Sequence, residues 1–380
     1  MMGHMKRPHI YILYTGGTIG MKQSPSGYKP CTGHLEALLE NNPKFKDPSL
    51  PEYTIEEFSP LLDSADVEPI HWGQIARAIA DNYDRYDGFV VLHGTDTMAY
   101  TASALSFMLE NLCKPVVLTG AQVPLEAIRS DGEANLIGTL MILASYHHIL
   151  SEVFVYFSNT LFRGNRVTKS DADAFNAFSS PDFPPVATAG TTIEIRKHRL
   201  LLSARESGLS VVEMGQARVA AIRLFPGIRA EYLSNMLNAS VDGVVLECFG
   251  AGNVPSRNRP LMAAIRDAVA RRVVILAVTQ ALRGTADLTL YATGQSLMKA
   301  GVVSGFDMTC EAALAKLFYL FDKGHTPEEV RQLAGRNLRG ELTPAGVRAI
   351  GIEQLRMRLG ASLVAPAADD PPRNSGAPGT

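Results

Sequence analysis

The chain has 380 residues, with 36 Lys and Arg against 38 Asp and Glu, a net charge of −2 and an apolar fraction of 46%. This length exceeds what a single core usually holds and predicts two domains. Balanced charge without a basic stripe argues against nucleic-acid binding, and no apolar stretch reaches the roughly 20 residues of a membrane span. Four widely separated cysteines predict neither a zinc site nor disulfides and, with no secretory signal, favour a cytoplasmic protein.

The first two predicted strands are each followed by a threonine-containing loop. A strand at residues 9–14 precedes the loop TGGTIG at 15–20, and a strand at 88–92 precedes the loop HGTDTM at 93–98. Both apolar runs are short and bounded by turn residues, as expected of strands buried on two faces of a parallel sheet. Because ligands bind beyond the carboxyl ends of such strands, we expect both loops to form one site.

The elements around these loops alternate between strand and helix. A polar segment at residues 22–30, rich in Pro, Gly and Ser, predicts a mobile surface loop beside Thr18. An apolar helical face predicts a helix that starts near Thr97, with Asp96 as its N-cap. Three further elements are predicted along the chain: a strand at 114–120, a helix over 134–144 and a strand at 153–157.

The second half of the chain weakly repeats the first. Residues 242–246 (DGVVL) resemble 87–92 (DGFVVL), although buried parallel strands share a limited vocabulary in any case. We therefore expect two α/β domains with mainly parallel sheets, the amino-terminal one being larger. The expected boundaries are 8–190 for the N-terminal catalytic domain, 191–217 for a linker with a hairpin at 191–202, 218–359 for the C-terminal domain and 360–380 for a disordered tail.

The residues of the first loop are compatible with two classes of function. One is a binding module for a nucleotide or a small amino acid, although the loop lacks the spacing of a dinucleotide fingerprint or a P-loop. The other is an amide hydrolase in which Thr18 is the nucleophile and the glycines leave room for an oxyanion. His93 and Asp96 add a Thr–His–Asp triad as a runner-up mechanism. A structural, hydrogen-bonding His93 is the favoured interpretation.

With both loops in this order, the chain resembles the L-asparaginases, and in particular their cytoplasmic, type I bacterial branch. The similarity extends from about residue 8 to 359. The resemblance implies that L-asparagine is hydrolysed to L-aspartate and ammonia through a β-aspartyl ester on Thr18, without a metal or a cofactor. It also implies that Tyr28 closes over Thr18 and helps to activate it. The implied catalytic residues are Thr18, Tyr28, Thr95, Asp96 and Lys169.

The resemblance also implies how substrate is held. Asp63 and Ser64 bind the α-carboxylate end, and Asp96 pairs with the α-ammonium group. The carbonyl of Ala121 faces the leaving amide, while Asn253 enters the site of a neighbouring subunit. The implied substrate-binding residues are Asp63, Ser64, Thr95, Asp96, Ala121 and Asn253.

The implied ligands are L-asparagine and L-aspartate, and the implied assembly is a homodimer or homotetramer. Neither a nucleic acid nor a membrane is an expected partner. The alternatives within the enzyme class are a glutaminase-asparaginase and the asparaginase-like subunit of a tRNA-dependent amidotransferase. The balanced charge disfavours the second of these.

Overall fold

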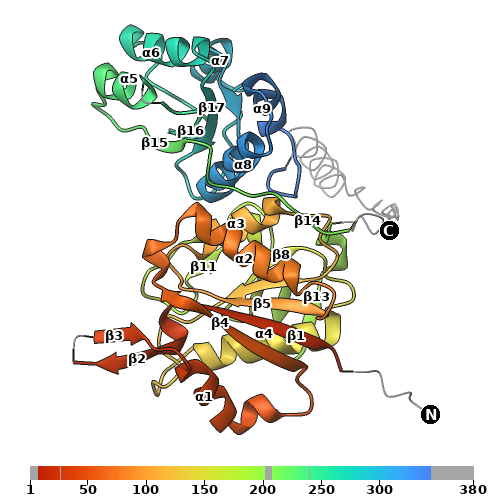
Figure 1. The fold of residues 1–380 in the computed structure, drawn as a ribbon. Helices are drawn as coiled ribbons and strands as arrows, with labels where there is room; N and C mark the ends of the chain where they lie inside the picture. The colour runs from red at the N-terminus through yellow and green to blue at the C-terminus, as the bar shows by residue number, and fades with distance from the viewer. Residues whose placement is uncertain (1–6, 26, 202–207, 239, 344–380) are drawn as a thin grey trace, which may run out of the picture. The chain divides into compact units, whose positions relative to one another are not determined.

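The computed structural model describes residues 7–25, 27–201, 208–238 and 240–343. The expected tail at 360–380, and the end of the expected C-terminal domain, lie outside these residues. The described chain contains a large mixed sheet and a second, parallel sheet, each packed with helices (Figure 1). This arrangement is the two-domain α/β fold that the sequence predicts. Within the described residues, no helix is long and apolar enough to cross a membrane.

The large sheet has eight strands, and its central part is parallel. Strands β4, β1, β5, β7 and β8 run parallel to one another, whereas β9, β12 and β13 continue one edge in antiparallel pairs. In spatial order the strands are β13 (Ile193–Ile195), β12 (Ala187–Ala189), β9 (Thr160–Arg163), β8 (Val153–Phe157), β7 (Val116–Thr119), β5 (Gly88–Leu92), β1 (His9–Gly16) and β4 (Glu52–Leu62). The central strands β5, β7 and β8 are buried throughout.

Helices cover both faces of this sheet because alternate residues of each strand point in opposite directions. Tyr11 and Leu13 of β1 pack with helices α2 and α3, whereas Ile10 and Ile12 pack with α1 and α4. Figure 1 shows α2 and α3 on one side of the sheet and α4 on the other. The four helices are α1 (His34–Asn41), α2 (Pro69–Asp81), α3 (Met98–Met108) and α4 (Gly132–Tyr146).

Two segments that the sequence left as loop or linker are regular. The polar segment 22–30, which the sequence predicts as a mobile surface loop, contains the paired strands β2 (Met21–Ser24) and β3 (Gly27–Pro30) instead of a loop throughout. Gly27 supports the tight turn with a φ of 102°. The hairpin expected at 191–202 lies earlier in the chain and is formed by β12 and β13. Strand β12 also pairs with β9, so the hairpin extends the large sheet.

The second sheet and its surroundings, residues 219–342, are called the C-terminal lobe below. Its four parallel strands are β15 (Val219–Arg223), β16 (Gly243–Cys248), β17 (Val274–Thr279) and β18 (Val303–Ser304). Its helices are α5 (Ala230–Asn238), α6 (Arg259–Ala270), α7 (Ala292–Lys299), α8 (Cys310–Asp322) and α9 (Pro327–Ala334). Helix α8 packs against α3, where Phe107 stacks on Tyr319 at 5.6 Å between ring centroids. The two sheets therefore share one continuous hydrophobic cluster.

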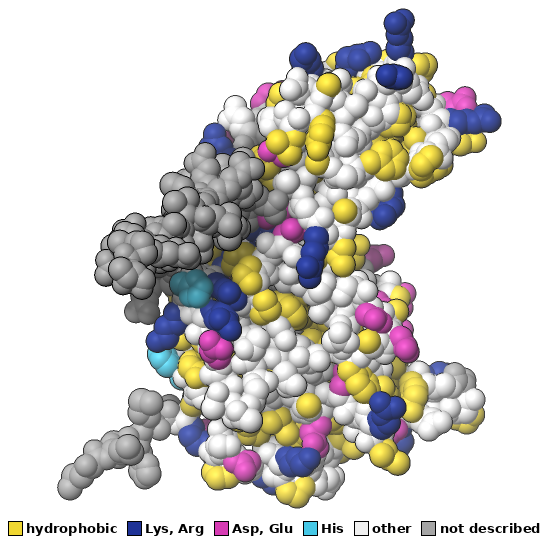
Figure 2. Space-filling view, turned by 180° about the vertical axis from the view of Figure 1, so that it is seen from behind, with side chains coloured by type: hydrophobic (Ala, Val, Ile, Leu, Met, Phe, Trp, Pro, Cys, Tyr) yellow, Lys and Arg dark blue, Asp and Glu magenta, His cyan; other side chains and the backbone are white. Residues whose placement is uncertain are grey.

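Short elements complete the described chain. They are the pairs β6 (Leu109–Glu110) with β14 (Ser210–Val211) and β10 (Thr168–Lys169) with β11 (Phe178–Ser179), and the 3-10 helices η1 (Thr18–Gly20), η2 (Pro43–Lys46), η3 (Ser64–Asp66), η4 (Gly164–Arg166) and η5 (Lys197–Arg199). Basic and acidic side chains are interspersed on the face seen in Figure 2, as the balanced composition leads one to expect.

Candidate functional site

The loops that follow β1, β4 and β5 touch one another at the carboxyl edge of the large sheet. Gly17 has a φ of 86°, and a side chain at this position would collide with the backbone of Gly94. A side chain at Gly94 would in turn collide with Ser64. The hydroxyl of Thr15 donates to the carbonyl of Leu92 at 3.0 Å and joins β1 to β5. Both threonine loops therefore meet at one place, as the sequence predicts.

Thr95, Asp96 and Lys169 form a hydrogen-bonded group beside this meeting point. The Lys169 ammonium donates to the Thr95 hydroxyl at 2.8 Å and to Asp96 Oδ1 at 2.6 Å. Thr95 is buried, the Lys169 side chain is 17% exposed and the Asp96 side chain is 64% exposed. The ammonium thus approaches the Thr95 oxygen from the protein side, while Asp96 remains open to a ligand.

The helix-cap role predicted for Asp96 is wrong. Helix α3 begins at Met98, and its N-cap residue is Thr97, which makes no side-chain cap. The Thr97 hydroxyl instead donates to the carbonyl of Ser64 at 2.7 Å. Asp96 is one residue too early for the cap and is drawn to the cation of Lys169. Its carboxylate therefore belongs to the site and not to the helix.

Gln122 is a site residue that the sequence interpretation missed. Its Oε1 accepts a hydrogen bond from the Thr95 hydroxyl at 2.9 Å, and its Nε2 donates to the carbonyl of Ala172 at 3.1 Å. The carboxylate of Asp131 accepts from the backbone N–H of Gln122 and so fixes the loop after β7. The sequence signal for Gln122 is its place directly after Ala121, whose backbone carbonyl is a predicted site group.

Thr18 and Tyr28 lie on neighbouring elements. Thr18 is half-buried at the start of η1, and the next residue, Ile19, accepts a backbone hydrogen bond from Leu125 at 3.0 Å. Tyr28 lies on β3, which packs beside η1, and is 46% exposed. The hairpin thus carries the tyrosine next to the loop of Thr18, with the phenol open to solvent.

The remaining predicted residues fall into two groups. Ser64 is buried beside Gly94, Asp63 is exposed at the cap of η3, and Ala121 is buried after β7. Asn253 lies in the C-terminal lobe, where its Oδ1 accepts a hydrogen bond from Thr293. Within the described part of the chain, no hydrogen bond links the side chains of these four residues to the Thr95–Asp96–Lys169 group. Among the residues that the structure describes, no three His, Cys, Asp or Glu side chains are gathered to hold a metal ion.

His93 has a structural role in the described site. Its Nδ1 donates to the Gly94 carbonyl at 2.7 Å, since a carbonyl can only accept, and Nε2 then accepts from the Thr101 hydroxyl at 3.0 Å. Complete burial lowers the pKa of His93 to about 4. The neutral ring has both nitrogens engaged, so it is not placed as the base of a Thr–His–Asp triad.

The chain was compared with known protein families, sequences and structures. The model described as "Asparaginase, N-terminal" matches residues 9–201, and the "Glutaminase/Asparaginase C-terminal domain" matches 218–333. L-asparaginase 1 of Escherichia coli K12 is 46% identical over 90% of this chain and 99% of its own. A 60 kDa lysophospholipase of Mus musculus is 43% identical over 90% of this chain, which covers 63% of that longer protein.

A solved structure extends this similarity to three dimensions. L-asparaginase I of Vibrio cholerae matches with a TM-score of 0.82 and 48% sequence identity, covering 89% of this chain and 99% of its own. Both threonine loops lie within the residues that the first family model matches, and the second model matches most of the C-terminal lobe. The chain therefore belongs to the asparaginase family.

Proposed function

We propose that this protein is an L-asparaginase that hydrolyses L-asparagine to L-aspartate and ammonia. The observation that carries the proposal is the bond of Lys169 to Thr95 and Asp96 beside the Thr18 loop. Its occurrence in a chain 46% identical to an L-asparaginase 1 supports this substrate. The binding-module alternative does not account for a buried hydroxyl in contact with an ammonium.

The first half of the proposed reaction takes place at Thr18. Its Oγ adds to the side-chain carbonyl carbon of asparagine, while the Tyr28 phenol takes up the hydroxyl proton and releases its own O–H proton toward the amide nitrogen. The C–N bond then breaks, the nitrogen takes up that proton and leaves as ammonia, and a β-aspartyl ester remains on Thr18. Covalent catalysis of this kind replaces one difficult hydrolysis with two easier acyl transfers.

The second half uses Thr95, Asp96 and Lys169. Water adds to the ester carbon, the bond to Thr18 Oγ breaks, and the Thr18 oxygen recovers a proton as aspartate leaves. The Lys169 ammonium donates a hydrogen bond to the Thr95 oxygen and so fixes its position. The fixed oxygen then accepts a hydrogen bond from the attacking water and orients it. Asp96, with its exposed carboxylate, pairs with the α-ammonium of the substrate. Asp63 and Ser64 bind the α-carboxylate end, and the Ala121 carbonyl faces the leaving amide.

Ammonia release from L-asparagine, without added metal or nucleotide, tests the proposal. Thr18→Ala and Thr95→Ala should each lower turnover by more than about 10³-fold, since each removes a group that works with others as a unit. Circular dichroism should show both variants folded. Wild-type activity in a folded Thr18→Ala protein would exclude Thr18 as the nucleophile.

The ratio of kcat/KM for L-asparagine to kcat/KM for L-glutamine distinguishes an asparaginase from a glutaminase-asparaginase. One added methylene displaces the amide carbon from Thr18 while the α-groups stay anchored, and such a change is worth roughly 10–200-fold in kcat/KM. Nearly equal kcat/KM values would favour a glutaminase-asparaginase.

The proposal includes a cytoplasmic location and a homodimer or homotetramer with shared sites. Two exposed apolar residues of the C-terminal lobe, Leu290 (59%) and Tyr291 (55%), lie directly before α7. The Thr293 hydroxyl, which binds Asn253, lies just beyond them at the start of α7. An exposed apolar group next to a positioned amide supports insertion of Asn253 into the site of a second subunit.

A further inference from the structure

The strand that carries Lys169 has little support from the large sheet. Strand β10 consists of two residues, Thr168 and Lys169, and it pairs with the equally short β11. Adjacent residues of a strand point to opposite faces. The Lys169 side chain reaches Thr95, and the Thr168 side chain consequently points the other way. Whatever holds Thr168 therefore sets the direction of Lys169.

Thr168 is held by the C-terminal lobe. Its hydroxyl donates to Glu311 Oε1 at 2.6 Å, and Glu311 is buried in the first turn of α8. Burial raises the pKa of Glu311, while the hydrogen bond from Thr168 opposes this rise. The carboxylate is separated from Thr168 by 143 positions in the chain, so this contact exists only because α8 packs near β10.

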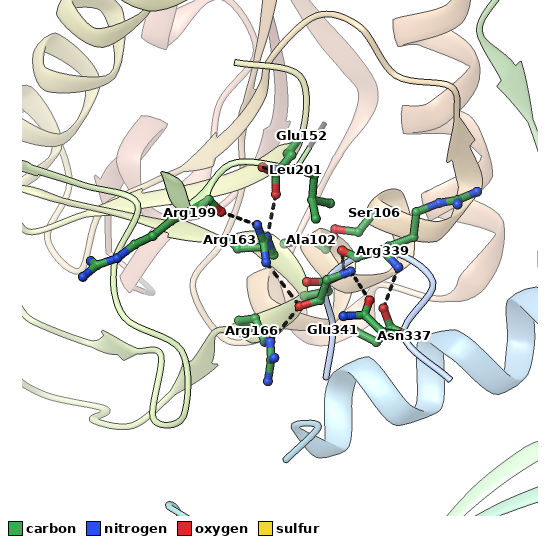
Figure 3. Close-up of polar contacts among 12 residues, drawn as sticks. Ala102, Ser106, Glu152, Arg163, Arg166, Arg199, Leu201, Asn337, Arg339 and Glu341 are labelled. Atoms are coloured by element: carbon green, nitrogen blue, oxygen red, sulfur yellow. Dashed lines mark hydrogen bonds and ion pairs between the residues drawn. The ribbon is translucent and has the colours of Figure 1, made fainter. Parts of the chain in front are cut away.

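The residues immediately before Thr168 are clamped by the same lobe. Arg166 forms a fully buried ion pair with Asp307 at 3.2 Å. Arg166 Nε donates to the Gly340 carbonyl at 2.7 Å, and Arg163 donates to the same carbonyl at 3.4 Å. Figure 3 shows Arg163 also bound to Glu152. These contacts hold the backbone up to residue 166. Beyond it, the pairing with β11 and the Thr168–Glu311 hydrogen bond hold β10.

A cavity next to this bond gives the strand room to move. It has a volume of about 300 Å³, and Thr168, Glu311 and Arg166 are among its lining residues. If the Thr168–Glu311 hydrogen bond is lost, the open volume on this side gives β10 room to shift, since only its pairing with β11 then directs it. Lys169 would move with it, because the two residues share one peptide unit.

We propose that Glu311 is a positioning residue for the reaction, because its hydrogen bond to Thr168 aims the Lys169 ammonium at Thr95. This proposal rests on the function proposed above for Lys169. Glu311 touches neither Thr18 nor Thr95 among its contacts; it acts through Thr168. A misplacement of about 1 Å at a reacting group can lower a rate by roughly 10²-fold. Loss of the Thr168–Glu311 hydrogen bond can therefore slow the reaction although neither side chain touches the substrate.

Thr168→Val and Thr168→Ser in the full-length protein form the matched test. Valine keeps the shape and loses the hydroxyl, so kcat for L-asparagine should fall roughly 10- to 100-fold with little change in KM. Serine keeps the hydroxyl and should recover most of the lost kcat. Glu311→Leu should lower kcat by a similar factor, and its combination with Thr168→Val should cost no more than either change alone, because both remove one contact.

A control and a separate variant make the outcomes distinct. Glu328→Gln removes an exposed ion pair to Arg272 in the same lobe and should keep the wild-type kcat. Lys169→Met tests the proposed function: wild-type kcat in this variant would overturn the role of Lys169. If Lys169→Met loses turnover, whereas folded Thr168→Val and Glu311→Leu proteins keep the wild-type kcat, the positioning role of Glu311 is wrong. Circular dichroism and thermal unfolding establish folding in each case.

Discussion

At the scale of single residues, His93 shows how a site can contain a histidine that does no acid–base work. Its two ring nitrogens bind Gly94 and Thr101, and burial keeps the ring neutral. Protonation would require a cation inside the core and would break the bond from Thr101. The pattern of a histidine beside a threonine loop suggests a triad, but the direction of its hydrogen bonds decides against it.

This neutral histidine makes stability depend on pH. The unfolded state binds a proton near pH 6.5, whereas the native ring does so only near pH 4. The free energy of unfolding is therefore unaffected by His93 above pH 6.5 and falls as the pH drops from 6.5 to 4, by about 3 kcal/mol in all. Urea unfolding of the wild type and His93→Gln, which keeps a donor and an acceptor but does not titrate, should differ in slope across this range. Identical slopes would contradict the assignment.

At the scale of elements, most residues of the two strands in the β2–β3 hairpin are exposed to solvent. The backbone N–H of Gln23 donates to Glu126 at 3.3 Å, and Glu126 also pairs with His34 at the start of α1. Tyr28, on the opposite strand, is 46% exposed. Gln23 and Tyr28 face each other in the hairpin register, so one strand is held to Glu126 while the other carries an exposed tyrosine. We expect such a hairpin to act as a lid that closes over substrate.

Tyr28→Phe should lower kcat by about 10²-fold, with a smaller effect on the binding of aspartate, because it removes the hydroxyl that relays the proton but keeps the ring. Aspartate should also slow trypsin cleavage of the wild type at Lys22 and Lys29, since closure buries the hairpin. Tyr232→Phe, at an exposed tyrosine of α5, is the control and should keep the wild-type kcat. Normal kcat in Tyr28→Phe together with ligand-independent cleavage would show that the hairpin is not the catalytic lid.

At the scale of the whole molecule, the two lobes are joined by polar contacts as well as by the shared hydrophobic cluster. Asn165 donates to the Arg339 carbonyl at 2.9 Å, and Glu110 binds both Lys323 and Tyr319. Lys316 and Glu341 form a fully buried pair within the C-terminal lobe. Burial lowers the pKa of Lys316, and the carboxylate of Glu341 opposes this change. Such contacts hold the C-terminal lobe in place against the segment that carries Lys169.

Shared sites in an oligomer can be tested by mixing inactive subunits. If Asn253 completes a partner's site, Thr18→Ala and Asn253→Ala subunits that have exchanged should regain part of the activity through hybrid sites. Thr18→Ala mixed with Thr95→Ala is the matched control and should regain none, because both changes damage the half of the site contributed by one chain. A fully active monomer, measured by light scattering after size-exclusion chromatography, would contradict shared sites.

The main strands and the place of the site can be predicted from the amino-acid sequence. Short apolar runs such as 88–92 are stable only when both faces of the strand are buried. Because such strands run parallel, the loops that follow them lie at the same edge of the sheet. The meeting of the Thr18 and Thr95 loops follows from these local patterns. The α/β class and the family resemblance follow from them as well, because local patterning and loop composition are written directly in the chain.

The hydrogen-bond and ion-pair partners of the polar side chains depend on how the elements pack in three dimensions. Asp96 is equally suited to a helix cap and to an ion pair until Lys169, 73 positions away, is brought to 2.6 Å. The hydrogen-bond partners of Gln122 and Glu311 come from other elements, so neighbouring residues in the sequence do not indicate these contacts. The segment 22–30 has the composition of a loop, yet it pairs with itself as a hairpin. Hydrogen bonds and ion pairs depend on the separation of atoms in space, and for distant residues packing alone sets that separation.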